Sequence, residues 1–184
     1  MKITSIRLDR MRLPLDPPFH AAWDPVPRRH FDATLVTVET DEGVTGYGSG
    51  DTMDGFEPFE SLFTGRDPLS IAEHVRTIES IGFHAGMLRT RTIAELALLR
   101  HRWFTPHTWT NGLGLLANLH VVAGLGGGPY VEFPYDPPGW TEERRDFFLT
   151  EPVRIDADGC LNVPDQPGLG ASIDHAAVAR YRRS

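Results

Sequence analysis

The chain has 184 residues, which is enough for one large domain or two small ones with a buried core. Its formal net charge of −7 argues against a general nucleic-acid binder, and no apolar run is long enough to span a bilayer. Cys160 is the only cysteine, so an intrachain disulfide and a cysteine-based zinc site are excluded, and we expect a cytoplasmic protein. Lys2 is the only lysine, and a mechanism that needs a catalytic lysine must therefore use it.

The first part of the chain carries strand patterns. Residues 2–13 alternate apolar and polar side chains, which predicts a strand with one buried face. Residues 33–40 form the clearest strand pattern, and a glycine-containing turn leads from them into a short strand at 44–50. The proline-rich segment 14–31 and the aromatic segment 50–60 are predicted to be loops, and long loops in compact domains often carry function.

Helix patterns come next. Asp67 followed by Pro68 is typical of a helix start, and the apolar spacing predicts a helix from there to about Ser80. A second helix is predicted at 92–101.

The second half of the chain has the order of a parallel βαβ unit. It predicts a strand at 103–106, a helix at 112–124 and a strand at 130–133. A hairpin is predicted within 150–170, and a last helix at 174–182 ends in arginines, which are favourable at a helix C-terminus.

Four stretches resemble one known family, namely "KITSIRLDRMRLPL", "LVTVETDEGVTGYG", "FTPHTWTNGLGLLANLHVVAGLGGGPYVEFPYDPPGW" and "DGCLNVPDQPGLG". They resemble the enolase superfamily, in its mandelate racemase and muconate lactonizing enzyme subgroup. The resemblance implies an α+β capping domain over a modified TIM barrel. In that family, Mg²⁺ held by three carboxylates stabilises an enediolate, which forms when a lysine pair or a histidine removes the proton α to a substrate carboxylate. Many relatives dehydrate sugar acids, and others are isomerases.

The sequence departs from this pattern in the middle of the barrel. A TIM barrel takes about 250 residues, and this chain is too short to hold one beside a cap. The Lys-x-Lys strand is absent, and residues 84–150 contain no series of three strand-end carboxylates, so we expect no specific magnesium site in this chain. We therefore predict an α+β fold with a capping domain made of 1–83 and 140–184. Residues 84–139 would be a remnant of the barrel that keeps its strands seven and eight.

Two residues match the family's catalytic positions. His107 corresponds to the base at the end of strand seven, and imidazole titrates near neutral pH. Glu132 corresponds to the carboxylate of strand eight that, in some relatives, hydrogen bonds to the substrate carboxylate as an acid. The alternatives are a histidine that bonds to backbone in the Pro106 turn and a carboxylate held by neighbouring backbone N–H groups.

Four further residues are candidates for substrate binding. His20, Trp23 and Arg28 lie in the segment that closes over the substrate in the family, and Trp109 lies at the predicted barrel mouth. A guanidinium can hold a carboxylate with two hydrogen bonds. The alternatives are solvated loop side chains and, for Trp109, a packing role at the helix start.

Two functions remain open from the sequence, besides a split enzyme whose missing strands come from a partner chain. By lineage, the chain is a mandelate racemase-like protein whose reaction is Mg²⁺-dependent proton abstraction from a small sugar acid, and which we expect to be inactive as this chain alone. The alternative is a non-catalytic, internally deleted remnant or interaction module that keeps the cap fold. Isolated parallel strands at 103–106 and 130–133 would leave open edges, so we also expect a homo-oligomer, with neither nucleic acid nor a membrane as partner.

Overall fold

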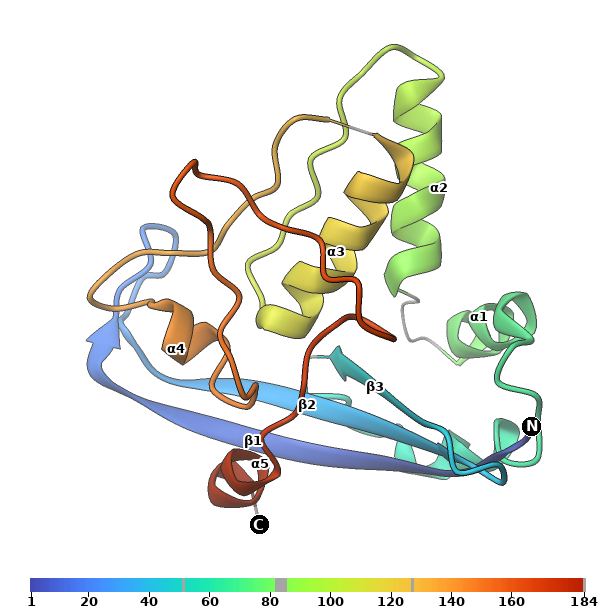
Figure 1. The fold of residues 1–184 in the computed structure, drawn as a ribbon. Coiled ribbons are helices and arrows are strands. Elements are labelled where there is room, and N and C mark those ends of the chain that lie inside the picture. Colours follow the sequence, from blue (N-terminus) through green and yellow to red (C-terminus); the bar gives the residue numbers. More distant parts are fainter. Residues whose placement is uncertain (51, 82–85, 127, 184) are drawn as a thin grey trace.

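A three-stranded antiparallel sheet forms the base of the molecule (Figure 1). The computed structural model describes residues 1–50, 52–81, 86–126 and 128–183. The strands are β1 (Ile3–Phe19), β2 (Arg28–Thr40) and β3 (Thr45–Gly50), in the order β1-β2-β3. Gly43 connects the last two strands with a φ of 76°, a left-handed conformation that glycine adopts without a steric penalty. The strands predicted at 2–13, 33–40 and 44–50 are confirmed.

The long loop predicted at 14–31 is wrong over most of its length. β1 and β2 continue through both ends of this segment, with Pro14 opposite His30 and Phe19 opposite Arg28. The prolines are tolerated because β1 is an edge strand, whose outer side needs no ladder hydrogen bond. The loop that remains spans only 20–27.

A short helical region follows the sheet. The segment predicted as a loop at 50–60 contains the start of a 3₁₀ helix, η1 (Glu57–Leu62). Helix α1 (Ile71–Ser80) begins four residues later than Asp67, the predicted cap. The carboxylate of Asp67 does accept a hydrogen bond from the backbone N–H of Leu69, at 3.0 Å, as a helix cap would. The turn that it closes ends at Ser70 and is not continuous with α1.

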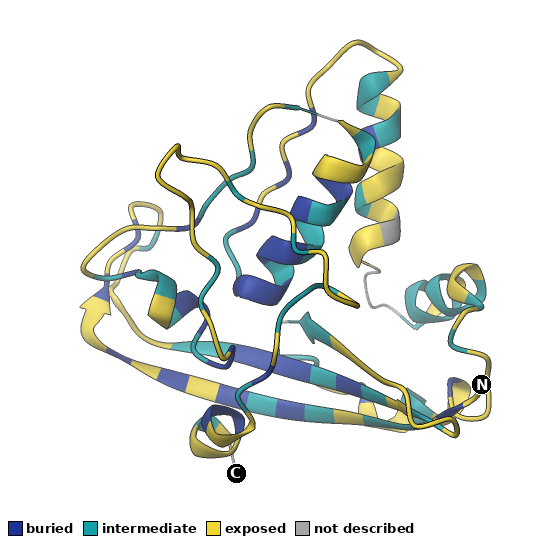
Figure 2. Ribbon diagram, in the orientation of Figure 1, coloured by how far each residue is buried: buried dark blue, intermediate teal, exposed yellow. Residues whose placement is uncertain are grey.

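Helices α2 (Gly86–Leu98) and α3 (Gly112–Leu125) pack side by side above the sheet (Figure 1). Helix α3 coincides with the predicted helix, whereas α2 starts and ends earlier than predicted. The Asn111 side chain caps α3 by accepting hydrogen bonds from two backbone N–H groups. Figure 2 shows that α3 is buried over much of its length and that α2 is largely exposed.

The predicted strands at 103–106 and 130–133 are not formed. Both segments are irregular in the structure, and the described residues offer no further strand beside them. A parallel pair without neighbours or covering layers is unstable, which explains the difference. The observed fold is thus α+β. The predicted domain boundary between residues 83 and 84 lies outside the described residues.

The C-terminal part of the chain returns to the sheet. It contains the short helix α4 (Glu142–Arg145), which was not predicted, and α5 (His175–Tyr181), which was. The turn at 156–160 forms, but no strands flank it, so the predicted hairpin is wrong. Just after α5, Arg182 pairs with Met11 of β1. The main apolar core joins β1, β2, α3, α5 and the segments between them: Met11, Ala33, Leu35, Leu113, Phe148, Leu149, Ile173 and Val178. No helix in the described ranges has the length and apolar character needed to cross a membrane.

Candidate functional site

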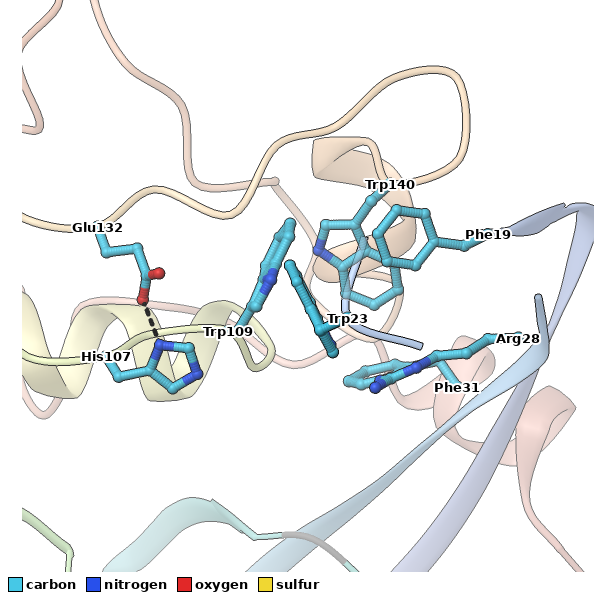
Figure 3. Close-up of a pocket in the computed structure, with 8 residues that line it drawn as sticks. All are labelled: Phe19, Trp23, Arg28, Phe31, His107, Trp109, Glu132 and Trp140. Atoms are coloured by element: carbon cyan, nitrogen blue, oxygen red, sulfur yellow. Dashed lines mark ion pairs between the residues drawn. The ribbon is translucent and has the colours of Figure 1, made fainter. Parts of the chain in front are cut away.

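A pocket of about 330 Å³ lies where the far end of the β1–β2 hairpin meets the segments around residues 107 and 132 (Figure 3). Five of the six side chains named as site candidates from the sequence line it, and they are accompanied by three others. The lining residues are Phe19, Trp23, Arg28, Phe31, His107, Trp109, Glu132 and Trp140. Residues from three distant parts of the sequence thus meet at one place.

One predicted site residue is not brought to the pocket. His20 follows β1 directly, is exposed, and is not among the lining side chains. The substrate-binding role predicted for His20 finds no support in this geometry.

Aromatic rings form one wall of the pocket. The Trp109 ring packs against Trp23, Phe19 and Trp140, with centroids 5.2, 6.0 and 6.2 Å away. The contacts with Phe19 and Trp140 are edge-to-face and the contact with Trp23 is tilted, and aromatic pairs at these distances are favourable and hold the rings in place. Trp109 therefore both packs at the start of α3 and lines the pocket. The packing role considered from the sequence is thus realised, and the substrate-binding role stays a prediction.

The polar side of the pocket centres on His107 and Glu132. The imidazole Nδ1 lies 3.0 Å from Oε2 of Glu132, and the His107 side chain is 77% exposed. In Figure 3 the other imidazole nitrogen, Nε2, is directed away from Glu132. Oε2 of Glu132 also accepts a hydrogen bond from the backbone N–H of Thr108. The alternative interpretation of Glu132, a carboxylate held by backbone, is thus realised together with the contact to histidine.

Arg28 supplies a positive charge on the opposite side. Its guanidinium donates hydrogen bonds to both carboxylate oxygens of Asp24, one of them at 3.2 Å. These hydrogen bonds lower the pKa of the Asp24 carboxyl from its usual value. Arg28 remains 46% exposed, so its remaining N–H groups can still reach a bound anion.

The donor set does not fit Mg²⁺. This ion prefers an octahedral shell of oxygens that includes at least one or two carboxylates, with three in the family pattern. Within the described part of the chain, no three His, Cys, Asp or Glu side chains are grouped so as to hold a metal ion. Glu132 is the single acidic residue of the pocket lining, and Oε2 is already occupied by N–H donors.

Buried polar contacts support the start of α3, next to the pocket. The ion pair between Arg145 and Asp146 has side chains with no exposed surface, and an added Cβ on Gly112 would lie 2.5 Å from the Asp146 carboxylate. Neither this pair nor Thr108 and Trp140 was predicted. Arg145 and Asp146 were missed because the charged stretch "TEERR" is typical of an exposed helix start. Thr108 and Trp140 were missed because neither belongs to a sequence motif that indicates a site.

Comparisons with known proteins agree with this architecture. Residues 80–177 match the model of the family "Enolase C-terminal domain-like". Among curated proteins, the chain is 30% identical over 159 residues to D-xylonate dehydratase of Haloferax volcanii, an alignment that covers 86% of this chain and 35% of the relative. It is 32% identical over 97 residues to arabinonate dehydratase of Saccharolobus solfataricus, covering 53% of this chain and 24% of the relative. The chain therefore spans about a quarter to a third of the length of the curated relatives it matches.

Solved structures share the fold at low identity. A member of the enolase superfamily from Polaromonas sp. JS666 has a TM-score of 0.70 and 15% identity, with 100% of this chain and 98% of that chain covered. An enolase from Streptomyces coelicolor has a TM-score of 0.71 and 14% identity, with 98% and 96% covered. Since the family model matches more than half of the residues, the chain belongs to the enolase C-terminal domain-like family, within the enolase superfamily that its motifs resemble.

Proposed function

We propose that the pocket binds a small organic carboxylate and that His107 is the acid–base group that faces this ligand. The observation that carries the proposal is the contact between His107 Nδ1 and Glu132, because it leaves Nε2 as the nitrogen available to a ligand. Arg28, on the same lining, provides the charge that a carboxylate needs. The names of the curated relatives, an arabinonate and a D-xylonate dehydratase, make sugar acids the first ligands to test.

The proposal does not extend to magnesium-assisted turnover. The described residues lack the carboxylates for the ion, and Lys2 stands just before β1, whereas Phe19 at the other end of that strand lines the pocket. At about 3.3 Å per residue, this separation is roughly 50 Å. We therefore expect this chain alone to bind the acid without a magnesium-dependent release of its α-proton.

Binding and exchange can be measured separately. Calorimetry with xylonate and arabinonate should give saturable binding with a Kd of about 1 mM, which corresponds to a binding free energy of about −4 kcal/mol. Xylitol, which lacks the carboxylate, should not bind. His107→Ala and Arg28→Ala should weaken binding, whereas His20→Ala, a control outside the pocket, should not. Equal binding of xylonate and xylitol would overturn the proposal.

The exchange experiment uses the same ligands in D₂O. We expect no Mg²⁺-dependent incorporation of deuterium next to the carboxylate above the protein-free rate. Mg²⁺-dependent incorporation that disappears in His107→Ala would show that the chain is an active enzyme, and it would refute the part of the proposal that concerns turnover.

A second candidate function is that of an interaction module. Leu99, Trp103 and Tyr130 are 77%, 70% and 65% exposed, and the last two rings contact each other edge-on. Large exposed apolar side chains that lie together often mark an interface. On this alternative the chain forms a homo-oligomer through this surface, and sedimentation equilibrium measures it directly.

A further inference from the structure

Glu132 is held by three contacts that direct its carboxylate at His107. Its Oε2 accepts a hydrogen bond from the backbone N–H of Thr108 and lies 3.0 Å from His107 Nδ1. The Thr108 hydroxyl donates to the backbone carbonyl of Glu132 and lies 3.3 Å from Oε2. Thr108 has no exposed surface, so its ends of these contacts are shielded from water, whereas the Glu132 side chain is 39% exposed.

We propose that Glu132 is a positioning residue for His107, and that Thr108 is the anchor that keeps Glu132 in place. This inference rests on the proposed function, in which His107 faces the ligand. It changes the role expected for Glu132 from the family resemblance, which would direct this carboxylate at the ligand. In this chain Oε2 is already occupied by donors from the protein itself.

The contact decides which imidazole nitrogen carries the proton. A neutral imidazole has one N–H, and an ionised carboxylate can only accept a hydrogen bond. The proton therefore lies on Nδ1, between the ring and Glu132, and the lone pair lies on Nε2. Without the contact, a side chain that is 77% exposed could rotate and exchange tautomers.

Thr108 is needed because no sheet holds the two segments together. Residues around 107 and around 132 are irregular, so no ladder of backbone hydrogen bonds fixes their distance. The Thr108 hydroxyl bonds to the Glu132 backbone, and the Thr108 N–H bonds to the Glu132 side chain. One buried residue thus fixes both the main chain and the carboxylate of Glu132.

The test is the tautomer of His107 in the free protein, read from ¹⁵N chemical shifts of the imidazole at a pH above the titration range of histidine. His74 is an internal reference, because its Nε2 lies 2.8 Å from the carbonyl of Asp67 and must carry the proton there. We expect His107 to have its proton on Nδ1, the opposite of His74. In Glu132→Ala the tautomer ratio of His107 should shift about tenfold toward Nε2–H, the size of one charge-assisted hydrogen bond, while His74 stays unchanged.

The anchor role of Thr108 is tested by a matched pair of variants. Thr108→Val removes the hydroxyl and should move the His107 tautomer ratio in the same direction as Glu132→Ala, whereas Thr108→Ser keeps the hydroxyl and should resemble the natural protein. Glu132→Leu, which is close in volume and offers no acceptor, serves as a second variant if the alanine variant does not fold. His107 with its proton on Nε2 in the natural protein would overturn the inference, and so would a ratio that none of these variants changes.

This readout is independent of the proposed function, because no ligand is present. A His107 tautomer as expected, together with no binding of any carboxylate, would leave the positioning role standing and refute the proposed function. Carboxylate binding together with a His107 proton on Nε2 would support the proposed function and refute the positioning role of Glu132.

Discussion

The buried pair of Arg145 and Asp146 gives the strongest stability prediction. The guanidinium donates two hydrogen bonds to the Asp146 carboxylate, at 2.8 and 2.7 Å, and further hydrogen bonds to the carbonyls of Pro134 and Val153, at 3.2 and 2.5 Å. It also lies 4.4 Å from the centroid of the Phe133 ring. The pair thus connects α4 to two irregular segments that contain little regular hydrogen bonding of their own.

Arg145→Met removes the positive charge and keeps most of the side-chain volume. The Asp146 carboxylate then stays buried with the backbone N–H of Val153, at 2.7 Å, as its remaining described partner. Breaking a buried ion pair in this way costs about 3–5 kcal/mol in the free energy of unfolding. With an m-value of about 2 kcal/mol/M, the urea midpoint should fall by roughly 1.5–2.5 M.

Arg154 offers a matched control. Its guanidinium pairs with Glu142 and Glu143 on the surface and is 55% exposed, so Arg154→Met should cost less than about 1 kcal/mol. The double variant Arg145→Met with Asp146→Leu should cost less than the sum of the single variants, because no unpaired charge is left buried. Urea unfolding followed by circular dichroism measures the natural protein, the two arginine variants, Asp146→Leu and the double variant. An Arg145→Met variant no less stable than Arg154→Met would refute this reasoning.

Three further predictions concern other parts of the molecule. Asn111→Ala should lower the free energy of unfolding by about 1–2 kcal/mol, because its side chain caps α3; thermal unfolding measures this, and no loss would contradict it. The Asp32 carboxyl accepts hydrogen bonds from Arg12, which lower its pKa, so this pair stabilises the fold above the unfolded-state pKa of about 3.9, and the stabilisation is lost as the pH falls through the folded-state pKa. Asp32→Asn should therefore lower the free energy of unfolding by about 0.5–1 kcal/mol at pH 7. As the pH is lowered, this free energy should fall less steeply in the variant than in the natural protein, and an equal slope in the two proteins would contradict the prediction. Trp103→Ser combined with Tyr130→Ser should reduce self-association in sedimentation equilibrium, and an unchanged association constant would exclude this surface as the interface.

Local patterns in the sequence predicted the elements that depend on local interactions. Helix α3 matches its prediction because Asn111 caps its start and Gly126, with a φ of 61°, ends it. The sheet was predicted from alternation and from the turn at Gly43, although its first two strands proved longer. Proline content indicated a loop there, whereas an edge strand accommodates prolines.

The elements that depend on distant partners were predicted less well. The patterns at 103–106 and 130–133 are typical of strands, but a strand forms only beside another strand, and the described residues provide none. The pocket residues, too, were predicted where a local motif marks them and missed where only packing brings them together. His107 and Glu132 were found by motif, whereas the contact between them and the anchoring by Thr108 follow from a packing that no local pattern encodes.

The most direct test of the central claim is an NMR titration of the isotope-labelled protein with xylonate, and with xylitol as the neutral control. The imidazole signals of His107 and the indole N–H signals of Trp23 and Trp109, all on the pocket lining, should shift in a saturable way with xylonate and stay in place with xylitol. Shifts that do not saturate, or shifts that xylitol reproduces, would contradict a carboxylate site at this pocket.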